Sequence, residues 1–248
     1  MSKTRPLALL LLLAIAALLN ACSSAGQIED SDSGMRIGIS PAAYPVNEAV
    51  QVCAAGALAE KQRLVIESLN VDPINLDSFD FAIQLGGWSD DEQVIAEISE
   101  EKLIIILHAS NPVRSINNEQ IADLFSGRID NWRLLDGNEA DVALWIGLEK
   151  DEGRGAVERE ILAGSPVSGN AMLASSPQHM LNVVSADVNA VGLLPRAWVD
   201  SSVRSVDSNI TLPVLTITGG DLSGEARAII ACLQDEQGQS ILAESYMQ

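Results

Sequence analysis

This 248-residue chain has few side chains whose type and spacing could carry out covalent chemistry. The histidines are His108 and His179, and neither lies in a G-x-S-x-G turn or beside a glycine-rich nucleotide loop. The acidic pairs at 90–91 and 100–101 lie beside expected turns, which is typical of solvated faces rather than of paired catalytic carboxylates. The sequence therefore assigns no catalytic residue, and a hydrolase is the least favoured class of function.

Composition excludes several other classes. A formal net charge of −19 argues against nucleic-acid binding, which needs a basic surface. Three cysteines and two histidines are too few for a disulfide scaffold and make a Cys/His zinc site improbable, so we expect no metal and no cofactor. Hydrophobic residues make up 47% of the chain, enough for a sizeable core.

The N-terminus has the pattern of an export signal. Lys3 and Arg5 precede an apolar run over residues 7–19, which is too short to span a bilayer comfortably. The following L-N-A-C, which ends at Cys22, resembles the bacterial lipobox. We expect residues 1–21 to be a lipoprotein signal peptide, Cys22 to be lipidated, and the protein to be held at the extracytoplasmic face of the cell membrane. An ordinary secretory cleavage site before a cysteine is the alternative.

The residues after the signal change character abruptly. Residues 22–34 are small, polar and acidic without periodicity, and are therefore expected to form a flexible tether. Beyond the tether, Cys53 and Cys232 fall in expected helices. In an exported protein these two cysteines could form a disulfide, and two buried free thiols fit the sequence equally well.

The body of the chain alternates strand and helix patterns, which predicts an α/β protein. One helix has a clear start, because Asn117 can cap it with Gln120 at the capping-box position, and Gly127 ends it. The other expected helices cover residues 46–60, 152–162, 177–185, 222–234 and a last short one to 246. The expected strands cover residues 35–40, 64–66, 79–83, 103–107, 142–146, 190–194 and 210–217.

One contiguous segment carries a family resemblance. Residues 111–132 read N-P-V-R-S-I-N-N-E-Q-I-A-D-L-F-S-G-R-I-D-N-W and follow an apolar strand. This segment resembles the phosphate-binding-protein family of ABC-transporter substrate-binding proteins. Weaker matches at suitable distances extend the resemblance over residues 35–245: G-I-S-P at 38–41, D-F-A-I at 80–83, D-E-G-R-G-A-V-E at 151–158 and A-V-G-L-L-P at 190–195.

The resemblance implies a type II periplasmic-binding-protein fold over residues 35–248, with two α/β lobes and a ligand cleft between them. Lobe one would comprise 35–108 and 196–248, and lobe two 109–195. The implied function is that of a solute-binding protein that closes on a small molecule or oxyanion and delivers it to an ABC permease, as a monomer and without enzymatic activity. The alternative is a non-transport sensing or interaction module with a degenerate cleft.

Most residues that would bind phosphate in the family are replaced. Leu85 falls where the family has an acid, Glu149 where it has an arginine, and residues 153–155 read G-R-G instead of S-G-T. Phosphate is thus no more expected than another small polar ligand, to which Tyr44 or Trp88 could offer an aromatic face. Arg154 could meet an anion or be a solvated charge. The candidate ligand-binding residues are Ser40, Tyr44, Gly86, Gly87, Trp88, Asn111, Arg154 and Gly155.

Overall fold

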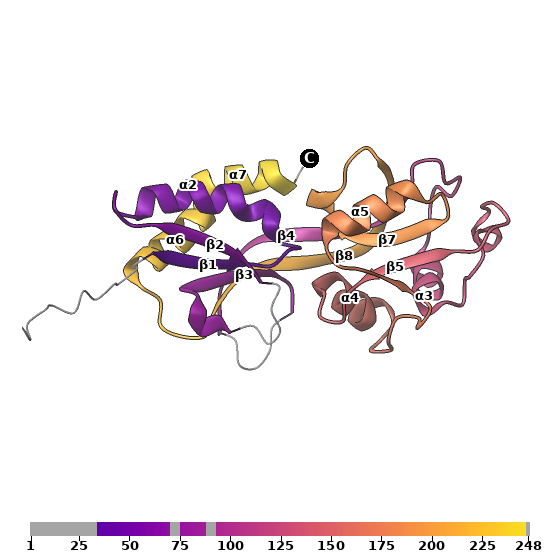
Figure 1. Cartoon of the computed structure of the whole chain (residues 1–248), viewed down its shortest axis with the longest axis horizontal. Coiled ribbons are helices and arrows are strands. Elements are labelled where there is room, and N and C mark those ends of the chain that lie inside the picture. Colours follow the sequence, from indigo (N-terminus) through magenta and orange to yellow (C-terminus); the bar gives the residue numbers. More distant parts are fainter. Residues whose placement is uncertain (1–33, 70–74, 88–92, 247–248) are drawn as a thin grey trace, which may run out of the picture. The chain divides into compact units, whose positions relative to one another are not determined.

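A computed structural model describes residues 34–69, 75–87 and 93–246 (Figure 1). Gly34–Gln248 forms one compact unit. The expected signal peptide, Cys22, nearly all of the tether and Trp88 lie outside the described residues. The described part of the chain contains no helix whose length and apolar character would let it cross a bilayer.

Eight strands form one mixed sheet in the order β2-β1-β3-β8-β4-β7-β5-β6. The strands β1, β2 and β3 pair in parallel, as do β5, β6 and β7, while the β3–β8, β4–β8 and β4–β7 pairs are antiparallel. Their bounds are β1 Met35–Ile39, β2 Leu64–Ser68, β3 Phe81–Leu85, β4 Gln93–His108, β5 Ala143–Gly147, β6 Met172–Ala174, β7 Ala190–Pro195 and β8 Val203–Thr218.

The two longest strands, β4 and β8, connect the two ends of this sheet. Each has 16 residues, and they pair with each other along their length. The pairing shifts register at three points, and at the last of them Leu103 lies opposite Ile210 whereas Ile104 lies opposite Asp207. At this break Asn209 has a left-handed backbone with φ 59°, and Ser208 Oγ donates to the Leu103 carbonyl oxygen at 2.5 Å. We call residues 103–104 and 207–210 the strand break.

Helices cover the sheet in two groups (Figure 1). Near β1–β3 lie α2 (Asn47–Ala57), α6 (Gly224–Gln234) and α7 (Glu236–Tyr246). Near β5–β7 lie α3 (Asn118–Ser126), α4 (Glu152–Ala156) and α5 (Pro177–Ala186), and α4 continues as a π-helical turn over Val157–Ile161. Short 3-10 turns cover Tyr44–Val46, Leu76–Ser78, Trp132–Leu135 and Arg196–Trp198.

The helix predicted from the capping pattern is confirmed. Asn117 accepts a hydrogen bond from the Gln120 backbone N–H, and the Gln120 side chain accepts from the Asn117 N–H, so both halves of the capping box are present. Gly127 ends the helix at φ 77°, a left-handed conformation that glycine adopts without strain. Phe125 and Trp132 are buried in the core beside it.

Cys53 and Cys232 form a disulfide that joins α2 to α6. The two cysteines are 179 residues apart in the chain. Of the two arrangements that the sequence left open, the structure therefore has the bond.

Three strands differ from expectation. The structure has β4 from Gln93 and β8 from Val203, ten and seven residues before the expected starts, and the strand expected over 79–83 lies at Phe81–Leu85. The edge strand β6 was not expected at all. The first parts of β4 and β8 are hard to predict because the pairing of these strands is irregular. The strand β6 is hard to predict because it has only three residues.

Candidate functional site

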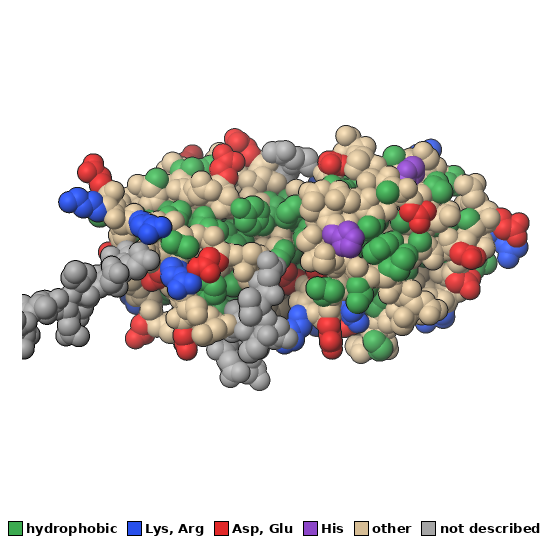
Figure 2. Space-filling view, viewed as in Figure 1, with side chains coloured by type: hydrophobic (Ala, Val, Ile, Leu, Met, Phe, Trp, Pro, Cys, Tyr) green, Lys and Arg blue, Asp and Glu red, His purple; other side chains and the backbone are tan. Residues whose placement is uncertain are grey.

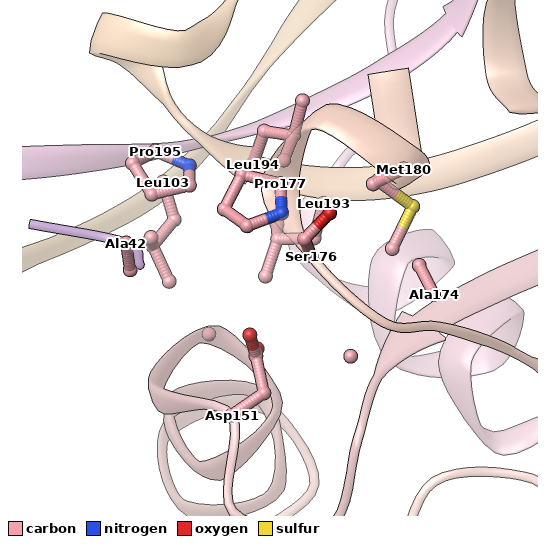
Figure 3. A pocket seen from close by; sticks show the side chains of 12 residues that line it. Ala42, Leu103, Asp151, Ala174, Ser176, Pro177, Met180, Leu193, Leu194 and Pro195 are labelled. Atoms are coloured by element: carbon pink, nitrogen blue, oxygen red, sulfur yellow. The ribbon is translucent and has the colours of Figure 1, made fainter. Parts of the chain in front are cut away.

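A pocket lies where the β1–α2 loop meets α4, α5 and the middle of β4 (Figure 3). Its volume is about 20 Å³, enough to hold a water molecule. Most of the lining is apolar, and Asp151 is its charged member. The lining residues are Ala42, Leu103, Gly147, Asp151, Gly153, Ala174, Ser176, Pro177, Met180, Leu193, Leu194 and Pro195.

Asp151 caps α4 and directs its carboxylate into the pocket. Its Oδ1 accepts a hydrogen bond from the Arg154 backbone N–H at 2.9 Å. Figure 3 shows the carboxylate pointing from the start of α4 toward Pro177 and Ser176, across the pocket. Burial raises the pKa of this carboxyl, while the hydrogen bonds from the Arg154 and Gly153 backbone lower it. The pocket therefore contains a carboxyl group whose ionisation is disfavoured.

Glu152 extends from the same turn toward the ends of β1 and β3. Its Oε1 accepts a hydrogen bond from the backbone N–H of Leu85, the last residue of β3, at 3.1 Å. The pKa of Glu152 is raised to about 7. Burial and the charge of Asp151 raise it, whereas hydrogen bonds from Ser40 and Leu85 act in the opposite direction. This contact connects α4, beside β5, with strands at the opposite end of the sheet.

Two of the sequence-predicted site residues have structural partners of their own. Asn111 is buried, accepts from the Val113 N–H and donates to the Val188 carbonyl oxygen, so it shapes the turn after β4. The Arg154 guanidinium pairs with Glu158 at 3.0 Å, one helical turn further on. Neither residue lines the pocket.

The remaining described candidates also lie outside the pocket lining. Ser40 is buried next to Glu152, and Gly86 and Gly87 follow β3 with positive φ angles. Tyr44 is 44% exposed, and Gly155 has open space around its Cα. None of the seven predicted residues that the structure describes lines the pocket. Their role in ligand binding stays a prediction.

Asp151 and Glu152 are site residues that are not among the candidates predicted from the sequence. Asp151 carries a recognisable signal, because an aspartate before a helix is a preferred N-cap. Glu152 carries no such signal, since its partners Ser40 and Leu85 are remote in the chain. The resemblance directed attention to residues 153–155 instead, and these lie inside α4.

A third acid, Glu101 on β4, is 2% exposed. Its Oε1 accepts from the Arg196 N–H at 2.8 Å, whereas its Oε2 has no hydrogen-bond partner among the described residues. Burial raises the pKa of this carboxyl to about 7, against the opposing effect of hydrogen bonds from the Arg196, Ala197 and Lys102 backbone. Within the described segments, no group of three or more His, Cys, Asp or Glu side chains is arranged to hold a metal ion.

No protein-family model matches the chain. Among solved structures, the chain is similar to a protein from Clostridium perfringens that is assigned as a phosphate ABC transporter substrate-binding protein and has phosphate bound. The identity is 20% and the TM-score 0.78, over 86% of this chain and 98% of that one. It is also similar to an ABC-type phosphate transport receptor from Vibrio cholerae, with 19% identity and a TM-score of 0.64 over 84% and 98% of the two chains.

The same fold occurs with a different ligand. The effector-binding domain of QuiR, in complex with shikimate, matches with 14% identity and a TM-score of 0.60 over 81% of this chain and 95% of that domain. At these identities the likeness concerns the fold and not the ligand. The chain has the type II periplasmic-binding-protein fold.

Proposed function

We propose that this protein is an extracytoplasmic solute-binding lipoprotein of an ABC uptake system. The anchor would be a lipid on Cys22, and residues 22–34 would form the tether to the folded part. The lobes over 35–108 with 196–248 and over 109–195 would close on a small solute as a monomer and present it to a permease. The protein performs no covalent chemistry in this proposal.

One observation carries the proposal: polar groups from both ends of the sheet meet at the Glu152 carboxyl group, which neighbours the pocket residue Asp151 in the chain. Ser40 and Leu85 come from the β1–β3 end, and Asp151 and Glu152 come from the β5 end. A solute held between them would contact both lobes, so its binding energy would favour the closed arrangement. The strand break lies on β4 and β8 between these two ends, and we propose that the ends move relative to each other at this point.

The charges of the site favour a solute that presents hydrogen-bond donors. Asp151 and Glu152 both supply carboxyl groups, and the guanidinium of Arg154 is paired with Glu158. A phosphate dianion placed here would be repelled unless the carboxyls were protonated. On the face seen in Figure 2, basic side chains are interspersed with acidic ones and do not form a single basic patch. We therefore propose a neutral or cationic polar solute.

A second function is favoured by the Glu152 contact. The Glu152 side chain of α4 already accepts a hydrogen bond from Leu85 at the opposite end of the sheet. A sensing or interaction module that has lost ligand binding would be expected to close in this way. The two proposals differ in one respect, because such a module would respond to no small solute.

Thermal unfolding of residues 34–248 against a ligand panel tests the proposal. This fragment contains the compact unit and its disulfide. The panel should contain phosphate, sulfate, molybdate, phosphonates, sugars, amino acids and polyamines. A ligand at 100 times its dissociation constant stabilises by about 2.7 kcal/mol, and a clear rise in midpoint is expected for a neutral or cationic solute.

The outcomes separate the alternatives. A rise with phosphate or sulfate would contradict the proposed solute class and support oxyanion uptake. A flat response to every compound would support the sensing or interaction module.

A further inference from the structure

The contact between Glu152 and Leu85 satisfies a backbone donor that the sheet leaves open. The β1–β3 pairing ends at Ile39 opposite Ile83, and the Ser40 N–H donates to the Ile83 carbonyl oxygen. Main-chain groups two residues apart in a strand face the same side, so the Leu85 N–H also faces the β1 side. It lies beyond the end of the β1 pairing, and the Glu152 carboxylate supplies its acceptor.

The donors around Glu152 are those that hold an oxyanion in general. A backbone N–H and a hydroxyl, from Leu85 and Ser40, both act on the same carboxylate. Such donors bind carboxylate or phosphate oxygens of a ligand equally well, because they recognise an anionic acceptor and not the rest of the molecule. The side chain of Glu152 itself is partly buried and is held at this position from α4.

We propose that Glu152 is an internal substitute for an oxyanion ligand. Its carboxylate accepts hydrogen bonds from the Leu85 backbone N–H and the Ser40 hydroxyl, and these donors are then not available to a free oxyanion. The same contact links the two ends of the sheet. Removing the side chain opens a site for a small carboxylate such as acetate. This inference rests on the proposed function in one respect, the assignment of this region as the ligand cleft.

Chemical rescue tests the substitution directly. Residues 34–248 are prepared as wild type, as Glu152→Ala, and as Glu149→Ala, which removes the same charge from an exposed position in the same loop. Each is unfolded by heat in sodium acetate and in sodium chloride of equal ionic strength. The E152A midpoint should rise by about 3–6 °C in acetate at ten times its dissociation constant, while wild type and E149A respond equally to the two salts.

Phosphate provides the second arm of the same experiment. Wild type should show no phosphate-specific rise, and E152A should show one if the opened site accommodates the larger anion. Equal responses of E152A and E149A to acetate would overturn the inference. So would a wild-type midpoint that rises with acetate as much as that of E152A.

A measurement on the unsubstituted protein covers the case in which E152A does not fold. The amide proton of Leu85 is followed by NMR between pH 5 and pH 9. Because it donates to Glu152, its chemical shift should titrate with a midpoint near 7, the value to which burial raises the pKa of that carboxyl. A Leu85 amide proton that exchanges with solvent as fast as an amide without a hydrogen bond would show that the contact is not formed, and the inference would fail.

The experiments can disprove the proposed function and the role of Glu152 independently of each other. If acetate rescues E152A while wild type binds nothing in the solute panel, the inference stands and solute uptake is wrong. If wild type binds a polar solute and acetate has no effect on E152A, solute binding stands and the role of Glu152 is wrong.

Discussion

Glu101 shows most clearly how a buried acid couples stability to pH. Its pKa is raised from 4.5 to about 7 because burial outweighs the hydrogen bonds from the Arg196, Ala197 and Lys102 backbone. The folded state therefore binds a proton that the unfolded chain has released between these two values. By linkage, the free energy of unfolding falls as pH rises from about 4.5 to 7, and the loss persists at higher pH.

Replacing Glu101 by Gln should remove this dependence. We expect the difference in unfolding free energy between pH 5 and pH 8 to shrink by about 2–3 kcal/mol relative to wild type. Urea unfolding at the two pH values measures it. Glu100→Gln is the control, because Glu100 is exposed on the neighbouring position of β4. If E101Q and E100Q have the same pH dependence, Glu101 does not carry the raised pKa.

Single residues were the hardest feature to predict from the sequence. Ser40 was named as a candidate, and it does lie beside the acidic pair. Asp151 and Glu152 cannot be identified from the sequence, because their significance depends on where α4 meets the ends of β1 and β3. That meeting joins residues 67 positions apart in the chain, Leu85 and Glu152, and no local pattern encodes it.

The disulfide connects helices whose own packing is otherwise apolar. Cys53 is 2% exposed on α2, and Cys232 packs against the core from α6. Together they close a loop of 179 residues, and a long closed loop restricts the unfolded chain strongly.

The double variant Cys53→Ser with Cys232→Ser should therefore lose about 2–5 kcal/mol of unfolding free energy. Chemical denaturation of residues 34–248 measures the loss. Addition of a reductant should lower the stability of wild type toward that of the variant and leave the variant unchanged. If reductant lowers the stability of both proteins equally, the effect does not come from this bond.

Secondary structure was predicted well wherever the signal was local. The capping box at Asn117 and the stop at Gly127 define α3 from a few neighbouring residues. The prediction failed for the first part of β4, because register shifts after Val94 and Glu97 disrupt its alternation of apolar and polar residues. It failed for the start of β8 because D-S-N at 207–209 has the composition of a turn, and Asn209 indeed has a positive φ.

The strand break is the feature on which motion between the two ends of the sheet should depend. Ser208 is buried there, donates to the Leu103 carbonyl oxygen and accepts from the Ile210 N–H. The first hydrogen bond crosses from β8 to β4 at the register shift, and the second lies within β8 and spans Asn209.

Ser208→Ala should lower the unfolding free energy by about 1–3 kcal/mol, because it leaves a buried donor and a buried acceptor without their partner. The amide of Ile210 should also exchange its hydrogen faster in native conditions. Urea unfolding and amide exchange measure the two effects. Ser205→Ala, at an exposed position of the same strand, should change neither. Slow exchange at Ile210 in S208A would mean that the break is held by other contacts.

The path of the chain through the fold has a consequence for its biosynthesis. The sheet end with β1–β3 is completed by α6, α7 and the last part of β8, so its core cannot close until the C-terminal residues have been made. At typical elongation rates Cys53 leaves the ribosome about 10–35 s before Cys232. Over that interval its thiol has no native partner. The bond between Cys53 and Cys232 can therefore form only after the final helices have been made.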